Sequence, residues 1–241
     1  MRCFVILPCY NEEKNVKPLI YSLDQALGSN MPYRVIAVDD GSLDRTGEIL
    51  KDLSSDYPVE ILVHQTNLGL GAALRTGLMQ AAEESFDDDV VITMDSDNTH
   101  DPKEVLNLVS ATRRADVVIG SRYVTGGVQI NVPAHRVVMS RVINALVSRV
   151  YGLSLKDNTS GFRCFKACLV KKVCGKFGKH LIEQSGFVAS LELLLKAVNS
   201  GGVVSEVPIL LDYGKKEGKS KMRLISTVLN YLALLLKRKQ V

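Results

Sequence analysis

Residues 89–102 read DVVITMDSDNTHDP, an apolar run that ends at two carboxylates, Asp95 and Asp97, separated by one residue. The run is short, rich in β-branched residues and followed by turn-forming residues, which is typical of a buried β-strand that leads into a loop. Two acids this close repel each other, and a cation beside them stabilises the pair. The stretch therefore predicts a strand whose exit loop binds a cation, and its neighbours along the chain indicate the fold.

The same pattern of a strand followed by a polar exit recurs along the first half of the chain. The predicted strands are residues 3–8, 34–38, 60–64, 89–94 and 116–120. Apolar residues at helical spacing predict helices between them, at about 12–27, 44–53, 73–84 and 102–113. Such alternation indicates an α/β fold, with a mostly parallel central sheet flanked by helices. Ligands bind beyond the carboxyl ends of these strands, so we expect the exits PCYNE, DDGS, HQTN, DSDN and GSRY to meet in one site.

The second half of the chain is less regular. The predicted elements are helices at 134–150 and 187–199, a loop at 157–165, a strand at 203–209 and a basic loop at 212–221. The apolar segment 224–236 is shorter than the roughly 17–25 residues needed to span a bilayer, so it is either a core helix or a helix in the membrane interface. No linker separates the halves, and we expect a single domain over 1–241 with a helical C-terminal elaboration.

The composition is that of an ordinary globular protein, with 46% hydrophobic and 23% charged residues. The net charge of +4 is mild, but lysine and arginine gather in the last third of the chain. This basic flank fits an anionic substrate or a membrane surface, and a solvated lysine-rich face explains it equally well. The N-terminus lacks a signal-peptide pattern and the five cysteines lack the spacing of a zinc site, which favours a cytosolic location with reduced thiols.

Several kinds of site contain two acids one residue apart. A calcium-binding EF-hand loop does not fit, because its sixth and twelfth positions are His100 and Leu106, where glycine and an acid are required. A dinucleotide site around NLGLGAAL (67–74) lacks the third glycine. The pattern D-x-D-x-T also occurs as the nucleophile motif of haloacid-dehalogenase-type phosphatases, although there it normally follows the first strand. In a nucleotide-sugar site, by contrast, the carboxylates hold a divalent metal that neutralises the leaving diphosphate.

Nine short motifs follow one another along nearly the whole chain. They are LPCYNEEKN (7–15), VDDGSLDRT (38–46), NLGLGAALRTG (67–77), MDSDNTHDP (94–102), GSRYV (120–124), RVVMSRVINAL (136–146), DNTSGFRCF (157–165), EVPI (206–209) and GKSK (218–221). In this order they resemble the motifs of glycosyltransferase family 2 enzymes, specifically the dolichol-phosphate mannose synthase branch. The resemblance implies the GT-A form of a Rossmann-like fold, with a nucleotide-sugar-binding half (1–125) and an acceptor-binding half (126–241).

The resemblance also implies roles for individual residues. The residues expected to contact the base, ribose or sugar of the donor are Pro8, Tyr10, Glu12, Asp39, Asp95 and Ser96. The expected ligands of the metal, Mg²⁺ or Mn²⁺, are Asp97 and Thr99. The expected phosphate-holding group is Arg122, Arg136 and Ser140, and arginine forks do fit phosphate oxygens in pairs. Lys215 and Lys221 flank the GKSK segment, which resembles a loop that closes over the donor.

Two positions depart from the family pattern. Thr99 stands where relatives often have a glutamine that completes the metal ligands, although a hydroxyl also binds a hard cation, directly or through water. Lys215 stands where many relatives have an arginine, so a point charge replaces a guanidinium fork in the loop.

The resemblance implies an inverting, metal-dependent glycosyltransferase that moves a sugar, foremost mannose from GDP-mannose, to a polyprenyl or dolichyl phosphate. A lipid phosphate is already anionic, so it needs no general base. The alternatives are a family 2 transferase that takes a UDP-sugar, with a polyprenyl phosphate or a saccharide as acceptor, and a protein that binds sugar nucleotides without turnover.

The expected location follows from the acceptor. Many relatives carry membrane-spanning helices beyond this region, whereas this chain stops at Val241. We expect a peripheral protein on the cytoplasmic face of a membrane, held there by interfacial contact or by a membrane partner subunit. No nucleic-acid partner is expected.

Overall fold

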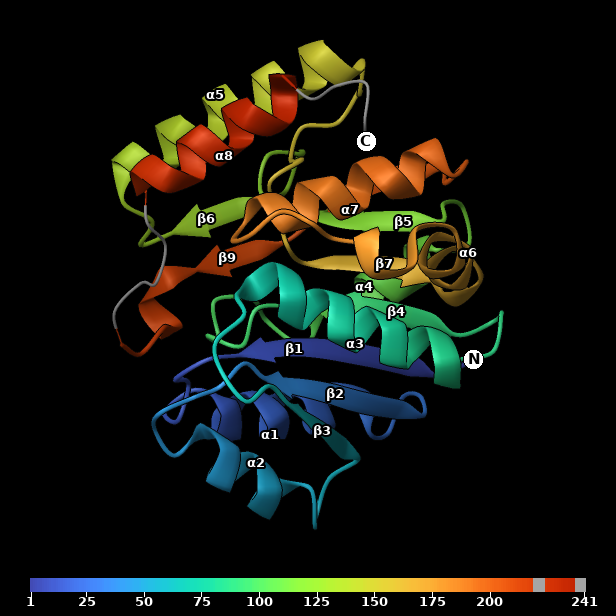
Figure 1. Ribbon diagram of the computed structural model, residues 1–241, viewed down its shortest axis with the longest axis vertical. Helices are drawn as coiled ribbons and strands as arrows, with labels where there is room; N and C mark the ends of the chain where they lie inside the picture. The colour runs from blue at the N-terminus through green and yellow to red at the C-terminus, as the bar shows by residue number, and fades with distance from the viewer. Residues whose placement is uncertain (219–223, 237–241) are drawn as a thin grey trace.

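The computed structural model describes residues 1–218 and 224–236, and a seven-stranded sheet runs through this part of the chain (Figure 1). The strand order is β3-β2-β1-β4-β7-β5-β8. Its strands are β1 (Cys3–Cys9), β2 (Tyr33–Asp39), β3 (Val59–Val63), β4 (Val90–Thr93), β5 (Val117–Ser121), β7 (Arg163–Lys166) and β8 (Val204–Pro208). Neighbouring strands are parallel except at β7, which is antiparallel to both β4 and β5. A separate parallel pair consists of β6 (Val128–Ile130) and β9 (Leu210–Asp212).

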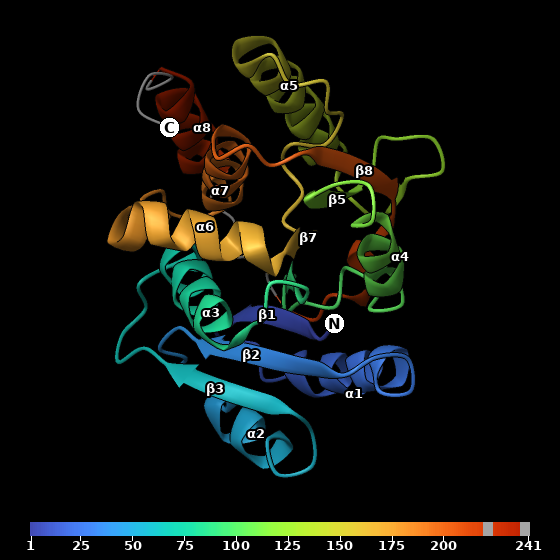
Figure 2. The same cartoon turned by 90° about the vertical axis from the view of Figure 1, so that its right-hand side faces the viewer.

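Helices cover both faces of this sheet (Figure 2). They are α1 (Val16–Leu27), α2 (Thr46–Leu53), α3 (Leu70–Glu84), α4 (Glu104–Ala111), α5 (Ala134–Tyr151), α6 (Ala167–Phe177), α7 (Val188–Asn199) and α8 (Leu224–Leu236), with short 3₁₀ turns η1 (Gly178–His180) and η2 (Tyr213–Lys215). In β1, Val5 and Leu7 enter the core that α1, α2 and α4 cover, whereas Phe4 and Ile6 enter the core under α3, α6 and α7. This burial on both faces explains why the predicted strands are continuous apolar runs.

The structure confirms the expected α/β fold and the strands and helices predicted for the first half of the chain. Several helix ends shift by two to four residues, and the largest shift is that of the helix expected from about Glu12, which begins at Val16. Residues 12–15 form a turn instead, in which the backbone N–H of Asn15 donates to the carbonyl of Glu12 at 2.9 Å. The turn keeps the Glu12 side chain near the end of β1.

The second half differs from expectation at the loop predicted over residues 157–165. That prediction is wrong for the last residues, which belong to β7, a strand inserted between β4 and β5. β7 is only four residues long and contains the fully buried Arg163, so neither its length nor its composition signals a strand. The sequence also predicted no element for α6, β6 and β9. The helices expected at 134–150 and 187–199 are confirmed as α5 and α7.

α5 and α8 meet at one end of the molecule (Figure 1). The Tyr151 hydroxyl at the end of α5 donates to the backbone carbonyl of Leu234 in α8 at 3.0 Å. Tyr231 and Leu234 are buried against the rest of the protein, so α8 packs into the core along one side. Among the described helices, none is long and apolar enough to cross a membrane.

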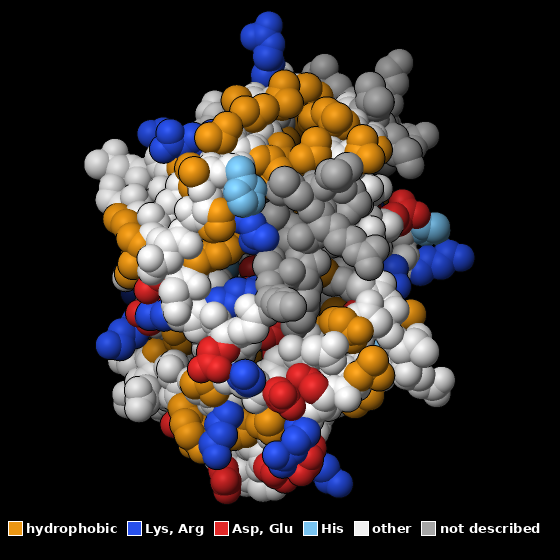
Figure 3. Space-filling model, turned by 90° about the vertical axis from the view of Figure 1, so that its left-hand side faces the viewer, with side chains coloured by type: hydrophobic (Ala, Val, Ile, Leu, Met, Phe, Trp, Pro, Cys, Tyr) orange, Lys and Arg blue, Asp and Glu red, His pale blue; other side chains and the backbone are white. Residues whose placement is uncertain are grey.

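The outer side of this end is apolar. Val138, Val142 and Leu146 follow one another at every fourth position of α5, and their exposed fractions are 61, 54 and 39%. Residues four apart share a face of a helix, so the three form a continuous stripe. Leu229 and Leu232 of α8 are exposed as well. Hydrophobic side chains gather at this end in Figure 3, with lysine and arginine side chains beside them.

The contact between α3 and β1 leaves no room for a side chain at Gly77. A Cβ atom there would lie 2.5 Å from Cγ2 of Ile6, a buried core side chain. We expect Gly77→Ala to lower the free energy of unfolding by about 1–3 kcal/mol, because overpacking forces core side chains out of their preferred rotamers. Gly175→Ala in α6 is the control, since no described atom lies within 4 Å of such a Cβ, and it should stabilise by up to about 1 kcal/mol. Urea titrations of both variants measure the difference, and equal effects would contradict the tight contact.

Candidate active site

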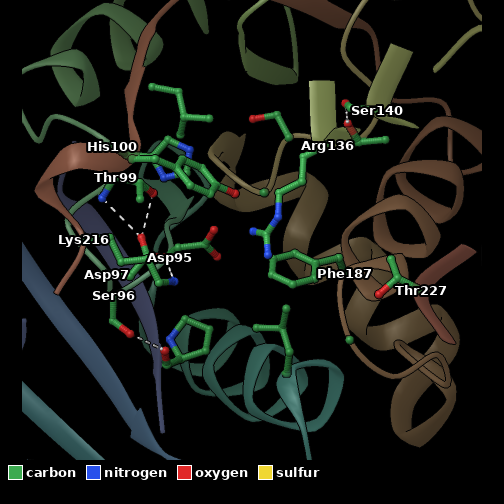
Figure 4. Close-up of a pocket in the computed structure, with 18 of the residues that line it drawn as sticks. Asp95, Ser96, Asp97, Thr99, His100, Arg136, Ser140, Phe187, Lys216 and Thr227 are labelled. Atoms are coloured by element: carbon green, nitrogen blue, oxygen red, sulfur yellow. Dashed lines mark hydrogen bonds and ion pairs between the residues drawn. The ribbon is translucent and has the colours of Figure 1, made fainter. Parts of the chain in front are cut away.

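A cavity of about 920 Å³ lies beyond the carboxyl ends of the strands (Figure 4). The exits of β1, β4 and β5, the start of α5 and the segment after β9 contribute to its wall. Residues that the sequence assigned to the site and that line this cavity are Pro8, Tyr10, Glu12, Asp95, Ser96, Asp97, Thr99, Arg122, Arg136 and Ser140. The strand exits therefore meet in one place, as an α/β sheet of this kind predicts.

Asp95 and Asp97 follow β4 almost directly. Asn98 has a positive φ of 63°, which asparagine tolerates better than most residues, and it turns the chain back. This turn brings Thr99 onto Asp97, where the hydroxyl donates to Oδ1 at 2.6 Å and the backbone N–H donates to the same oxygen at 3.2 Å. Nζ of Lys216 donates to Oδ2 of Asp97 at 2.5 Å. One carboxylate oxygen is thus held by its own loop, and the other faces a cation.

The two carboxylates differ in how readily they ionise. Burial and the neighbouring charge of Asp97 raise the pKa of Asp95 to about 7. Burial acts in the same direction on Asp97, but the ammonium of Lys216 and the hydroxyl of Thr99 outweigh it and hold the pKa of Asp97 below its usual value. Two half-buried acids this close need positive charge nearby to be fully ionised, which a metal supplies.

The ligands available here fit a divalent metal that binds together with a nucleotide. The described residues contain no group of three or more His, Cys, Asp or Glu that could hold a metal by itself. Mg²⁺ is usually held by one or two carboxylates plus substrate phosphates and water, and oxygen ligands also suit Mn²⁺. Asp95, Asp97 and the hydroxyl of Thr99 offer such oxygens on one loop.

Arg122, just after β5, is fixed by a carboxylate from the loop before β7. Its Nε and Nη2 donate to the two oxygens of Asp157 at 2.7 and 2.6 Å. Nη2 also donates to the hydroxyls of Thr159 at 2.9 Å and Ser140 at 3.3 Å. The buried Asp157 balances the charge of Arg122, so the arginine is not an unpaired cation for a ligand. Its main role at the cavity wall is to hold these two hydroxyls.

Arg136 stands in the first turn of α5 and reaches toward the middle of the cavity, with the acidic loop on one side and Phe187 on the other (Figure 4). Its guanidinium lies over the ring of Tyr213, 5.7 Å from the centroid, a cation–π contact that orients it. Ser140 is one turn further along the same face of α5. Arg136 and Ser140 thus form a basic and hydroxyl-bearing wall opposite the two acids.

The cavity becomes apolar on the side of Phe187. Side chains from α3, α5, α8 and the residue before α7 form this part, namely Leu70, Met139, Ile143, Phe187 and Tyr231. The cavity therefore joins a charged end to an apolar end, a combination that suits a ligand with an anionic head and a hydrocarbon tail.

Three other predicted site residues do not line the described cavity. Asp39 is buried at the end of β2 and accepts a backbone N–H of its own turn at 3.0 Å, whereas its neighbour Asp40 does reach the cavity wall. Lys215 forms a surface ion pair with Asp101 at 3.5 Å. Lys221 lies outside the described residues.

Sequence reasoning missed three residues that complete the site. Lys216, rather than Lys215, reaches Asp97, and two adjacent lysines carry no signal that distinguishes them. Asp157 opens the motif DNTSGFRCF, so its position was marked, but its role as the partner of an arginine depends on the insertion of β7. His100 also lines the cavity, and burial lowers the pKa of its imidazole to about 4, so the ring is neutral.

A Rossmann-like sheet whose acidic β4 exit faces arginine and serine side chains is the architecture of a GT-A glycosyltransferase. The profile described as Glycosyl transferase family 2 matches residues 4–174, and the chain belongs to this family. It is therefore an enzyme of the glycosyltransferase class, and this result excludes the phosphatase interpretation of D-x-D-x-T. The branch that the motifs indicated is confirmed by the relatives described next.

Three curated relatives align along most of the chain. The polyprenol monophosphomannose synthase of Mycolicibacterium smegmatis is 33% identical, over 92% of this chain and 81% of that protein. The undecaprenyl-phosphate mannosyltransferase of Micrococcus luteus is 32% identical, over 92% of this chain and 88% of that protein. The dolichol-phosphate mannosyltransferase of Pyrococcus furiosus is 33% identical over 96% of this chain, which spans only 62% of that protein.

Solved structures agree on the fold. The glucosyl-3-phosphoglycerate synthase of Mycobacterium tuberculosis, in complex with Mn²⁺ and UDP-glucose, is similar with a TM-score of 0.67 and 21% identity, over 99% of this chain and 78% of that one. Its complex with Mg²⁺ and UDP has a TM-score of 0.66 and 21% identity, over 99% of this chain and 79% of that one. At this identity the similarity confirms the GT-A fold alone.

The ion pair of Arg122 and Asp157 leads to a prediction about stability and pH. Asp157→Asn leaves a buried guanidinium without its counter-charge, so we expect the free energy of unfolding at neutral pH to fall by about 3–5 kcal/mol. Burial would raise the pKa of Asp157, but Arg122 outweighs it and lowers the pKa below the unfolded value. The stabilisation by Asp157 is therefore present above about pH 4, the unfolded pKa, and is lost as the pH falls through the lower folded pKa.

Denaturant titrations across pH check this prediction, because the gap between wild type and Asp157→Asn should narrow as the medium becomes acidic. Asp87→Asn is the matched control, since its ion pair with Lys171 lies on the surface and should contribute less than about 1 kcal/mol. A gap that stays constant down to low pH would show that the Asp157 charge does not carry the effect.

Proposed function

We propose that this glycosyltransferase moves mannose from a nucleotide sugar, foremost GDP-mannose, to a polyprenyl or dolichyl phosphate. One observation carries the proposal: a single cavity joins an acidic loop, an arginine–serine wall and an apolar end. The acidic loop suits the metal and diphosphate of the donor, the basic wall suits the acceptor phosphate, and the apolar end suits the first part of its lipid tail. The names of the three mannosyl-transferring relatives support mannose as the sugar and a polyprenyl phosphate as the acceptor.

In the proposed reaction an oxygen of the lipid phosphate attacks C1 of the sugar while the bond from C1 to the diphosphate breaks. The nucleophile is already anionic near neutral pH, so the displacement needs no general base and inverts the configuration at C1. Arg136 and Ser140 hold the acceptor phosphate, and Arg122 positions the serine hydroxyl. Mg²⁺ or Mn²⁺ bound at Asp97, when present, neutralises charge on the leaving diphosphate.

The donor side of the cavity is assigned to the β1 and β4 exits. Pro8, Tyr10 and Glu12 are proposed to contact the base and ribose, and Asp95 the ribose or the sugar. Ser96 is proposed to hold the two exits together, because its hydroxyl donates to the backbone carbonyl of Pro8 at 2.7 Å. The carboxylate of Asp39 accepts a hydrogen bond within its own turn, so we propose that Asp39 fixes the conformation of the β2 exit.

We propose that the protein works at the cytoplasmic face of a membrane, bound peripherally through α5 and α8. The exposed stripe of Val138, Val142 and Leu146 belongs to the same helix as Arg136 and Ser140, so the membrane surface and the acceptor phosphate site share one element. Apolar side chains next to basic ones are the composition of helices that lie in the interface of anionic membranes. A membrane partner subunit would bind over the same end.

A donor panel tests the proposed reaction. GDP-mannose, UDP-glucose and UDP-N-acetyl sugars are each incubated with a short polyprenyl phosphate, with and without Mg²⁺ or Mn²⁺. We expect a metal-dependent mannosyl lipid from GDP-mannose, and Asp97→Asn should lower its turnover by about 10²–10³-fold, as losing one electrostatic contact to a leaving group does. Asp101→Asn, a surface acid in the same loop, is the control and should retain most of the activity. No lipid-linked product from any donor would refute the proposal.

Vesicle flotation tests the proposed membrane surface. Replacing Val138 and Val142 together by serine should weaken binding to anionic vesicles about thirtyfold, if each valine contributes roughly 1 kcal/mol by partial insertion. The control replaces Leu43 and Val63, which are also exposed but belong to the opposite end of the molecule (Figure 1). Equal losses for the two pairs would argue against α5 as the docking element.

A further inference from the structure

Lys216 places a positive charge directly on the carboxylate that is proposed to bind the metal. Its Nζ lies 2.5 Å from Oδ2 of Asp97, and the side chains of the pair are only 17 and 14% exposed. In Figure 4 a dashed line joins the end of the lysine side chain to Asp97. The other oxygen, Oδ1, already accepts the hydroxyl and the backbone N–H of Thr99. Both oxygens of Asp97 are thus engaged within the protein, and the partner of Oδ2 is a cation.

The segment that carries Lys216 is attached to the donor side of the cavity by a second set of contacts. The Asn15 amide donates to the carbonyl of Glu217 at 3.0 Å and accepts the backbone N–H of Glu217 at 3.3 Å. The same amide donates to Oε2 of Glu12 at 2.6 Å and accepts from the Asn98 amide at 3.2 Å. Asn15 is 2% exposed, so a buried side chain holds the backbone of the exposed Glu217. Lys216 is thus presented to Asp97 by backbone that is fixed independently of the ion pair.

We propose that Lys216 and the divalent metal are alternative partners of Asp97 Oδ2, so that metal binding detaches Lys216 from the acidic loop. The inference rests on the metal role of Asp97 in the proposed function. A metal bound within roughly 2.0–2.1 Å of Oδ2 would lie within a few ångströms of the ammonium, and two cations that close in a buried site repel each other. Before the metal binds, Lys216 balances part of the charge of the acid pair. Afterwards its ammonium is available to the anionic diphosphate that accompanies the metal.

Lys215 supplies a control inside the same segment. It carries the same charge one residue earlier, but its side chain is 47% exposed and pairs with Asp101 instead of Asp97. General electrostatics would affect both lysines, whereas competition at Oδ2 involves Lys216 only.

Amine footprinting of the intact protein tests the exchange directly. The wild type is acetylated briefly with and without Mn²⁺ alone, and the modification of each lysine is read by mass spectrometry. We expect Mn²⁺ to raise the modification of Lys216 several-fold and to leave Lys215 unchanged. Asp97→Asn should expose Lys216 without any metal. A Lys216 that stays protected when Mn²⁺ is bound would overturn the proposal.

Mn²⁺ titrations followed by electron paramagnetic resonance give a second readout. Lys216→Gln should bind Mn²⁺ several-fold more tightly than the wild type, and Lys215→Gln should not. Equal or weaker binding by Lys216→Gln, or an equal gain in both variants, would contradict competition. If Asp97→Asn leaves Mn²⁺ binding unchanged, the metal assignment in the proposed function fails together with this inference. If Mn²⁺ binding depends on Asp97 but Lys216→Gln does not change it, only the inference about Lys216 fails.

Discussion

The repulsion between two neighbouring, half-buried carboxylates after β4 is the constraint around which the site is arranged. Burial raises the cost of ionising Asp95, and its neighbour Asp97 raises it further. Thr99 and Lys216 stabilise the negative charge of Asp97, because each donates a hydrogen bond to a different oxygen of its carboxylate. An acid pair that is ionised only with outside help is well prepared to receive a divalent cation and a diphosphate, because their charge is what the pair lacks.

The ion pair of Arg122 and Asp157 fixes the wall of the cavity opposite the two acids. The chain after β5 reaches the cavity through Arg122, and the buried Asp157 neutralises this arginine with two short hydrogen bonds. Asp157 belongs to the loop before β7, the antiparallel strand that is wedged between β4 and β5. The insertion of β7 therefore fixes the distance between the acidic loop and the arginine–serine wall. These two walls are the ones to which the proposed function assigns the donor diphosphate and the acceptor phosphate.

Much of the fold was predictable because its signals are local. Apolar runs of strand length, helical spacing and turn residues lie within short windows, so the first five strands and their helices follow from the sequence. The short elements of the second half carry no such signal. β7 has a fully buried arginine whose guanidinium donates to the backbone carbonyls of Asn158 and Ser190. A buried charged residue at a strand position is tolerated because these carbonyls accept its hydrogen bonds, and the position of Ser190 near Arg163 cannot be predicted from a local sequence pattern.

The sequence by itself determined the α/β fold, the family motifs and ten of the residues that line the cavity, because residues at the ends of parallel strands converge wherever such a sheet forms. Tertiary structure alone decided which lysine meets Asp97, since Lys215 and Lys216 are chemically identical and differ only in the direction that η2 gives them. It also decided that Asp40 rather than Asp39 faces the cavity, because consecutive side chains at the end of a strand point to opposite sides.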